Sequence, residues 1–346
     1  MTGFGSIIEQ ERPVRILRTL YRKDAIPHAL LFTGQEGVGK RSAALALATI
    51  CNCMGRETSP PSHDDAQTRR RSAPIGNDEP CGACPACRKI GSENHPDVIR
   101  MGPTGATIKI AQVRALRETL SMKPYEARMR VVIITDAHVM SPSAGNALLK
   151  ILEEPPECTI LILTAPQRAD LLPTIVSRCQ WVRFNPITRR TIASELVQKH
   201  GLEKQAASVL AAVSNGSLTR AETLIQSDWL RYRSWLIAAS GLAAPEQRDT
   251  GRLLAFAETL SIRKEKVSDS LAALLTWLRD LIVFRYAPER IVNTDLIDLL
   301  QSASEKNPVG TVLNKMDAIR TAQKDIEANA NLRLALEVMM LRLAAV

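Results

Sequence analysis

Aromatic residues are scarce in this sequence, and no apolar run approaches the roughly 18–20 residues that a membrane span requires. Only 4% of the residues are Phe, Trp or Tyr. The amino-terminal segment MTGFGSIIEQERP has no basic stretch followed by an apolar one, so it does not read as a secretory signal. We therefore expect a cytoplasmic protein without a membrane partner. Abundant Leu and Ala predict a helix-rich fold.

The length and charge of the chain set further bounds. At 346 residues it is long enough for two or three domains. The formal net charge of +9 suggests an anionic partner such as nucleic acid or an acidic protein, with a solvated basic surface as the alternative. Seven cysteines in a chain without a secretory signal argue against a disulfide framework.

The first half of the chain alternates short apolar runs with helical patterns. Four runs predict buried parallel strands: residues 28–34, 130–135, 159–164 and 181–184. Before the third of these, a helix is expected to be capped by Ser141, to begin with Pro142 and to end at Pro155. This alternation is typical of a doubly wound α/β domain with a parallel sheet.

The strand signal ends near residue 186, which divides the chain. We expect an α/β phosphate-loop domain over residues 1–186, a small helical domain over 187–240 and an all-helical carboxyl-terminal domain over 241–346. A cysteine module, about 51–90, is inserted in the first domain. Within it, Met54 to Pro80 is polar and rich in Pro and Ser, which predicts an unstructured loop.

The segment GQEGVGK resembles a phosphate-binding loop in all but the residue that follows it. Its glycines are Gly34, Gly37 and Gly39. Such glycines let backbone N–H groups surround phosphate oxygens, and Lys40 would pair with the terminal phosphates. Where the pattern requires a hydroxyl for Mg²⁺, Arg41 stands, and Ser42 is one position out of phase. Whether ATP or ADP still binds to this degenerate loop stays open.

An ATPase also needs two acidic residues after an apolar strand, one for the metal and one to orient the attacking water. Here Asp136 stands alone between Thr135 and Ala137. The alternative role for Asp136 is to cap the following turn. The acidic position and the loop thus both depart from a working hydrolase.

The cysteines carry a metal-binding pattern. Cys81, Cys84 and Cys87 are spaced C-x-x-C-x-x-C, and Cys53 is preferred over Cys51 as the fourth ligand. Four thiolates complete a tetrahedral zinc site and leave no position open for catalysis, so a structural zinc is expected. An iron–sulfur cluster is the alternative. The other two cysteines, Cys158 and Cys179, are expected to be buried beside strands.

Together, several segments resemble the bacterial clamp loaders, the AAA+ assemblies of DNA polymerase III. They are HALLFTGQEGVGK, CGACPACRKIGSENHPD, NALLKILEEPP, TIVSRC and, near the carboxyl terminus, NANLRLALEVMMLRL. The last is similar to the collar segment of that family. The resemblance implies a component of the machine that opens the sliding clamp and closes it around primed DNA. It also implies motor (gamma/tau) and delta subunits as partners, with clamp and DNA contacted through the complex.

Within that family, the departures resemble those of the stationary delta-prime subunits. In the motors, the Asp-Glu pair falls where this chain has Thr135 and Asp136. The motors also have an arginine in a G-S-x-R context, whereas here Arg220 comes one residue late, after Gly216 to Thr219. The resemblance implies a subunit with no ATPase activity of its own. The alternative is an active gamma/tau-like ATPase subunit; a zinc-dependent DNA-binding module ranks last, because no base-reading element is evident.

In the SRC segment, the arginine finger of the family corresponds to Arg178. A guanidinium is permanently charged and can reach the γ-phosphate held by a neighbouring subunit. The resemblance therefore implies that Arg178 acts in trans, in the active site of another chain. The alternative is that Arg178 only forms a surface salt bridge.

Overall fold

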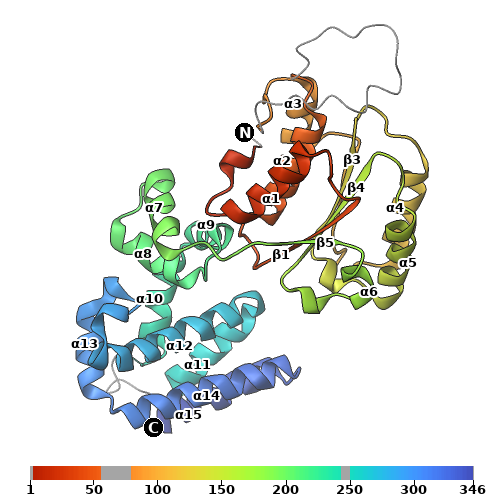
Figure 1. Cartoon of the computed structure of the whole chain (residues 1–346). Coiled ribbons are helices and arrows are strands. Elements are labelled where there is room, and N and C mark those ends of the chain that lie inside the picture. The colour runs from red at the N-terminus through yellow and green to blue at the C-terminus, as the bar shows by residue number, and fades with distance from the viewer. Residues whose placement is uncertain (1–2, 56–78, 243–249, 346) are drawn as a thin grey trace, which may run out of the picture. The chain divides into compact units, whose positions relative to one another are not determined.

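The computed structural model describes residues 3–55, 79–242 and 250–345 (Figure 1). The chain forms two compact units, Met1–Thr188 and Arg189–Val346. Most of the predicted loop over residues 54–80 lies outside the described residues. A further division of the second unit near residue 240 stays a prediction.

The first unit is built on a parallel sheet. Within its described residues the strands are β1 (Ala29–Thr33), β2 (Val98–Met101), β3 (Arg130–Ile134), β4 (Thr159–Ala165) and β5 (Gln180–Arg183). They lie in the order β2-β3-β4-β1-β5, and every neighbouring pair is parallel. The predicted α/β class and its four strands are confirmed, whereas β2 was not predicted.

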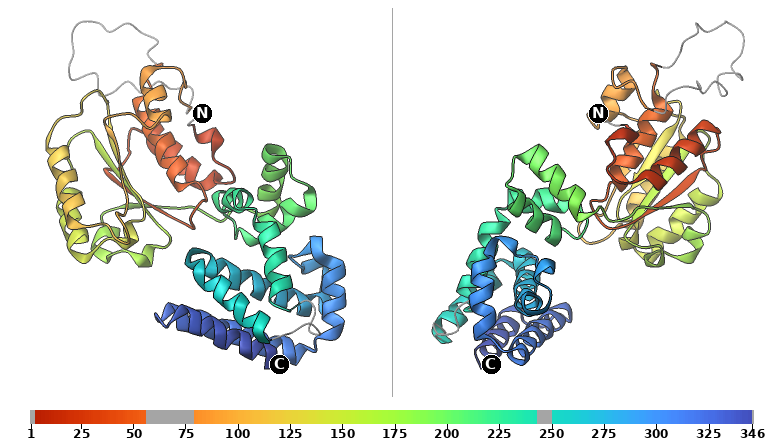
Figure 2. Two further views of the ribbon diagram at one scale, coloured as in Figure 1. Left: turned by 180° about the vertical axis from the view of Figure 1, so that it is seen from behind. Right: turned by 60° about the vertical axis from the view of Figure 1, so that its left-hand side comes forward.

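Helices cover both faces of this sheet (Figures 1 and 2). One face carries α1 (Glu11–Arg22) and α2 (Lys40–Asn52), and the other carries α4 (Ile110–Ser121), α5 (Pro142–Glu153) and α6 (Pro173–Val176). Because successive strand residues point to opposite faces, Leu30 and Phe32 pack with α1 and α2. The intervening Leu31 packs with the helices of the other face.

The local signals around α5 act as expected. The hydroxyl of Ser141 accepts a hydrogen bond from the N–H of Ala144, which satisfies a free donor of the first turn. Pro142 occupies the first helical position, and the helix ends at Glu153, before Pro155. The buried side chains of α5, among them Leu148, face the sheet. Strand β4 follows, as in a doubly wound domain.

The described part of the second unit is helical. Its α-helices are α7 (Arg189–His200), α8 (Lys204–Val213), α9 (Leu218–Gln226), α10 (Trp229–Ala239), α11 (Thr250–Ile262), α12 (Lys264–Tyr286), α13 (Ile297–Lys306), α14 (Val309–Glu327) and α15 (Leu332–Ala345). Of α15, Leu336, Met339 and Leu343 are buried, in agreement with the helical spacing read from the sequence. Among the described helices, none is long and apolar enough to cross a membrane.

Candidate functional site

The phosphate-loop segment connects β1 to α2. Gly34, Gly37 and Gly39 all have positive φ angles, of 147°, 74° and 99°, in the region that favours glycine. At Gly34 a Cβ atom would lie only 2.6 Å from the carbonyl oxygen of Phe184, so no larger residue fits without a shift of the backbone. The loop thus keeps the backbone turn that positions N–H groups at the start of a helix.

The ammonium of Lys40 turns back into this loop. Its Nζ donates to the carbonyl oxygens of Gly34 and Gln35, the latter at 2.8 Å. Burial lowers the pKa of Lys40, while the negative charges of Asp136 and Glu36 act in the opposite direction. The side chain of Lys40 therefore stabilises the loop through hydrogen bonds to two of its carbonyl oxygens.

Arg41, the residue in the hydroxyl position, is tied elsewhere. Its Nη2 lies 2.8 Å from Oε1 of Glu93, which also pairs with Arg100. The hydrogen bond from Arg100 is the main cause that holds the pKa of Glu93 below its ordinary value; burial opposes it, and the charge of Arg41 adds to the lowering. Arg41 is thus bound to the segment that follows α3 (Pro85–Gly91).

Thr135 follows β3 at the acidic position. Its hydroxyl donates to the carbonyl of Met101 at 3.3 Å, and a Cβ on Gly102 would lie 2.6 Å from the same Oγ1. Next to it, the N–H of Asp136 donates to Thr164. Within the described residues, the Asp136 carboxylate caps no N–H of the following turn, so the capping alternative for that side chain is wrong.

Arg178 lies just after α6, at the surface. Its Nη1 donates to the carbonyl of Thr174 at 3.0 Å, and its Nη2 lies 2.7 Å from Oε1 of Glu153. The side chains of Arg178 and Glu153 are 37% and 50% exposed. An ion pair this exposed contributes little to stability, about 0–1 kcal/mol. The salt bridge of the alternative interpretation exists, and it leaves the guanidinium accessible.

Arg220, the late arginine of the helical unit, is also paired. Ser217 caps α9 by accepting from the N–H of Arg220. The Arg220 Nη2 lies 2.8 Å from Oδ1 of Asp269 on α12. This arginine is bound within its own unit.

Four cysteines converge beside α2 and α3. The Sγ atoms of Cys53, Cys81, Cys84 and Cys87 all lie within 4.8 Å of one another, and those of Cys81 and Cys87 are 3.9 Å apart. Thiolates at about 2.3 Å from a tetrahedral ion lie about 3.8 Å from one another, so the cluster fits zinc. Cys51 points elsewhere: it packs against the apolar core, where burial raises the pKa of its thiol to about 12.

Backbone N–H groups surround the sulfur atoms of this cluster. The N–H of Cys81 donates to Cys53, that of Cys84 to Cys81 and that of Cys87 to Cys84, at 3.3–3.4 Å. Donation from Cys84 and Ala83 lowers the pKa of Cys81 to about 6, whereas burial raises the pKa of Cys87. A thiolate favoured at neutral pH is the form that binds metal.

The other two cysteines do not contribute to the cluster. Cys158, expected to be buried, is exposed: it lies in a turn before β4 with a φ of 54°. Cys179 is half-buried, and burial raises its pKa to about 11. The strand pattern did not reveal that Cys158 precedes rather than enters the sheet.

A basic groove that the motifs did not indicate lies between α4 and α5. It has a volume of about 700 Å³ and is lined by Ile110, Arg114, Arg117, Ser143, Asn146, Ala147 and Lys150. Its three cations form no ion pair with any described residue. The spacing of Arg114 and Arg117, one helical turn apart, is the signal in the sequence that would have found it.

Comparison with known proteins gives consistent matches over both units. A family model described as DNA polymerase III, delta subunit, matches residues 9–188, and one described as its C-terminal part matches 228–345. DNA polymerase III subunit delta′ of Bacillus subtilis is 30% identical over 339 residues, which cover 96% of each chain. Subunit tau of the same organism is 25% identical over 98% of this chain, which spans 61% of the length of tau. A solved gamma-subunit-related protein of Thermotoga maritima is 19% identical, covers 95% of this chain and 98% of its own, and has a TM-score of 0.43.

Proposed function

The chain belongs to the family of DNA polymerase III delta-prime subunits, and we propose that it serves the clamp loader without hydrolysing ATP. In this role it donates Arg178 to the active site of an adjacent motor subunit. Its partners are the motor (gamma/tau) and delta subunits. Through that complex it helps to load the sliding clamp on primed DNA.

The replacement of both metal-binding positions carries this proposal. Phosphoryl transfer needs Mg²⁺, which a hydroxyl after the loop lysine and an acid after the strand normally hold. The first position has Arg41, whose guanidinium repels a cation and is engaged with Glu93. At the second, the hydroxyl of Thr135 is engaged with Met101. The loop keeps its backbone turn, whereas the side chains at both Mg²⁺-binding positions are replaced and are engaged in other contacts.

Arg178 has the properties that an arginine finger needs. Its guanidinium is always protonated, and its planar set of donors matches phosphate oxygens. It is accessible, and the exposed pair with Glu153 is weak enough to be exchanged for a phosphate. After such an exchange, the hydrogen bond to the carbonyl of Thr174 would continue to orient the side chain of Arg178.

The four-cysteine cluster supports a structural zinc. Cys53, Cys81, Cys84 and Cys87 would supply four thiolates, so the metal has no open position for substrate. An iron–sulfur cluster needs its thiolates further apart, since several iron atoms lie between them. The short spacing of these sulfur atoms therefore favours zinc.

The basic groove supports a contact with DNA. Arg114, Arg117 and Lys150 offer three positive charges, and Ser143 and Asn146 add neutral donors. Such a surface binds phosphates without reading bases, which suits a loader that acts on primed sites of any sequence.

A row of exposed apolar residues on α15 supports subunit contacts. Leu334, Val338 and Leu341 are 59%, 39% and 44% exposed, and their spacing places them on one face of the helix. This face is distinct from the buried face of Leu336 and Met339. It suits a collar contact with neighbouring subunits of the clamp loader.

The proposal is tested in the assembled clamp loader by single-turnover ATP hydrolysis. Arg178→Ala is expected to remove the share of one active site from the fast phase, because loss of a finger slows its site by about 10³–10⁵-fold. The exposed Arg183→Ala is the matched control. An unchanged fast phase for Arg178→Ala would refute the role in trans. ATP turnover by this chain alone, abolished by Lys40→Ala, would favour the gamma/tau-like alternative.

A further inference from the structure

The segment between α4 and β3 is exposed at its tip and yet firmly bound at its backbone. The side chains of Met122 and Tyr125 are 65% and 86% exposed. We call residues 122–127 the tip loop. An apolar tip of this kind gains nothing from its own burial, so its conformation depends on the polar contacts beneath it.

A buried ion pair forms the inner support of the tip loop. Asp97 accepts from the N–H groups of Tyr125, Glu126 and Ala127 at 2.8–2.9 Å. Arg130 lies 3.4 Å from Asp97, and both side chains are at most 5% exposed. The guanidinium also donates to three carbonyls, those of Thr119, Met122 and Lys123.

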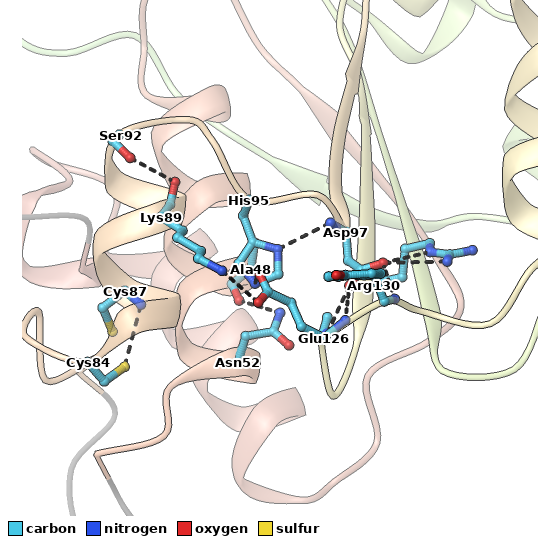
Figure 3. Close-up of polar contacts among 12 residues, drawn as sticks. Ala48, Asn52, Cys84, Cys87, Lys89, Ser92, His95, Asp97, Glu126 and Arg130 are labelled. Carbon is cyan, nitrogen blue, oxygen red and sulfur yellow. Dashed lines mark hydrogen bonds and ion pairs between the residues drawn. The ribbon is translucent and has the colours of Figure 1, made fainter.

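The cysteine cluster supplies an outer support from α3 (Figure 3). Lys89, two residues after the ligand Cys87, places its ammonium 2.8 Å and 2.6 Å from the two carboxylate oxygens of Glu126. The buried His95 contacts both acidic residues of this region. Its Nδ1 accepts a hydrogen bond from the N–H of Asp97, and its Nε2 lies 3.8 Å from Glu126. Helix α3, which contains Cys87 and is capped by Cys84, is thus joined to the tip loop.

A second connection between the cluster and the tip loop starts beside Cys53, the cluster cysteine that follows α2. Asn52, which precedes Cys53, donates to the carbonyl of Met129 at 2.9 Å and accepts from its N–H at 3.1 Å. Asn52 is 2% exposed, so water does not compete for these bonds. Met129 directly precedes Arg130 and so fixes the strand end of the tip loop.

Helix α3 depends on contacts outside itself for its stability, and the cysteine cluster supplies some of them. It has seven residues, far fewer than the roughly 12–15 that an isolated helix needs. Cys84 caps its first turn, with its sulfur accepting from the N–H of Cys87. A metal shared by Cys84, Cys87 and the distant Cys53 would therefore fix α3 against the end of α2.

We propose that the metal at the four cysteines sets the conformation of the tip loop, through Lys89 on one side and Asn52 on the other. The inference rests on the proposed zinc. Lys89 and Asn52 are positioning residues: they touch neither metal nor nucleotide, and they transmit the order of the cluster to Glu126 and Met129.

The test is hydrogen exchange of the full chain, resolved over residues 122–129, with the zinc content measured on the same samples. Removal of the metal by a chelator should speed exchange of these amides by about tenfold or more, since metal binding is coupled to folding. Lys89→Ala should retain the metal and speed exchange by about two- to fivefold, as expected for an exposed pair. Arg88→Ala, exposed on the same helix, is the control and should change nothing.

The possible failures are distinguishable. A zinc-loaded chain whose tip-loop exchange changes neither on chelation nor in Lys89→Ala overturns this inference and leaves the zinc proposal intact. A chain that binds no zinc overturns the zinc proposal. In that case a slow tip loop in the metal-free chain, unchanged in Lys89→Ala, would overturn the connection through α3 as well.

Discussion

At the scale of single residues, the proposed function depends most on the side chain of Arg178. Its neighbours in space, Thr174 and Glu153, come from α6 and α5, and they orient the guanidinium that we propose for the active site of an adjacent subunit. We predict that Arg178→Lys lowers the fast phase of ATP hydrolysis as much as Arg178→Ala does, because an ammonium lacks the planar fork that matches phosphate oxygens. Single-turnover hydrolysis by the assembled clamp loader checks this. A lysine variant with more than about half of the lost fast phase restored would contradict it.

The choice between two nearby cysteines is another residue-scale prediction. Cys53→Ser should reduce the zinc content of the purified chain, because it removes one of four sulfur atoms that lie within 4.8 Å of one another. Cys51→Ser is the matched control and should leave the zinc content unchanged, since Cys51 packs against the core. Metal analysis of the two variants measures both. Equal zinc loss in both variants would contradict the assignment of Cys53 alone, and full zinc content in Cys53→Ser would show that another residue can replace it.

At this scale the sequence was informative where spacing limits geometry. The C-x-x-C-x-x-C pattern places Cys81, Cys84 and Cys87 around one turn and the start of α3, so their convergence could be predicted. The pairing of Arg41 with Glu93 could not. It joins residues 52 positions apart, and it depends on how the cysteine module folds back on α2.

At the scale of elements, Asp97 and Arg130 connect β2, β3 and the tip loop. We predict that Asp97→Asn destabilises the chain by about 3–5 kcal/mol, because it leaves the buried Arg130 without its counter-charge. Chemical denaturation measures this loss. The exposed Glu118→Gln on α4 is the control and should have little effect. A loss below about 1 kcal/mol for Asp97→Asn would mean that the pair contributes little beyond its hydrogen bonds.

The same pair predicts a pH dependence. Burial opposes ionisation of Asp97, but the N–H groups of Glu126, Tyr125 and Ala127, with the charge of Arg130, hold its pKa below the ordinary 3.8. A lowered pKa in the folded state stabilises the fold above the unfolded value, and this contribution is lost as the pH falls through the folded value. Stability should therefore decline below about pH 4, with a smaller decline in Asp97→Asn. An identical acid profile for both proteins would contradict this explanation.

The buried central strands and the edge strand β5 could be predicted from the sequence, whereas the other edge strand, β2, could not. Strands β1, β3 and β4 are buried and mostly apolar, and each was identified. Strand β2 has four residues at the edge of the sheet, and only Met101 among them is buried. Arg100 interrupts its apolar pattern in order to pair with Glu93. The pairing of β2 with β3 stabilises it as a strand, although its own sequence pattern does not predict one.

At the scale of the whole molecule, we infer a subunit that works through its neighbours. The groove of Arg114, Arg117 and Lys150 should contribute to DNA binding by the assembled clamp loader. The double variant Arg114→Ala with Arg117→Ala should reduce the slope of log K against log salt by about 2, roughly one for each phosphate that the protein no longer neutralises. Affinity measured at several salt concentrations gives the slope. An unchanged slope would place the DNA-binding surface elsewhere.

The central claim is that this chain keeps an idle loop and activates its neighbour. The most direct test is clamp- and DNA-stimulated ATP turnover by the rebuilt clamp loader, with Lys40→Ala compared with Arg178→Ala in this chain alone. We expect Arg178→Ala to lower turnover sharply and Lys40→Ala to leave it intact. The opposite result, with Lys40→Ala as the damaging change, would make the loop a working nucleotide site and this chain a motor.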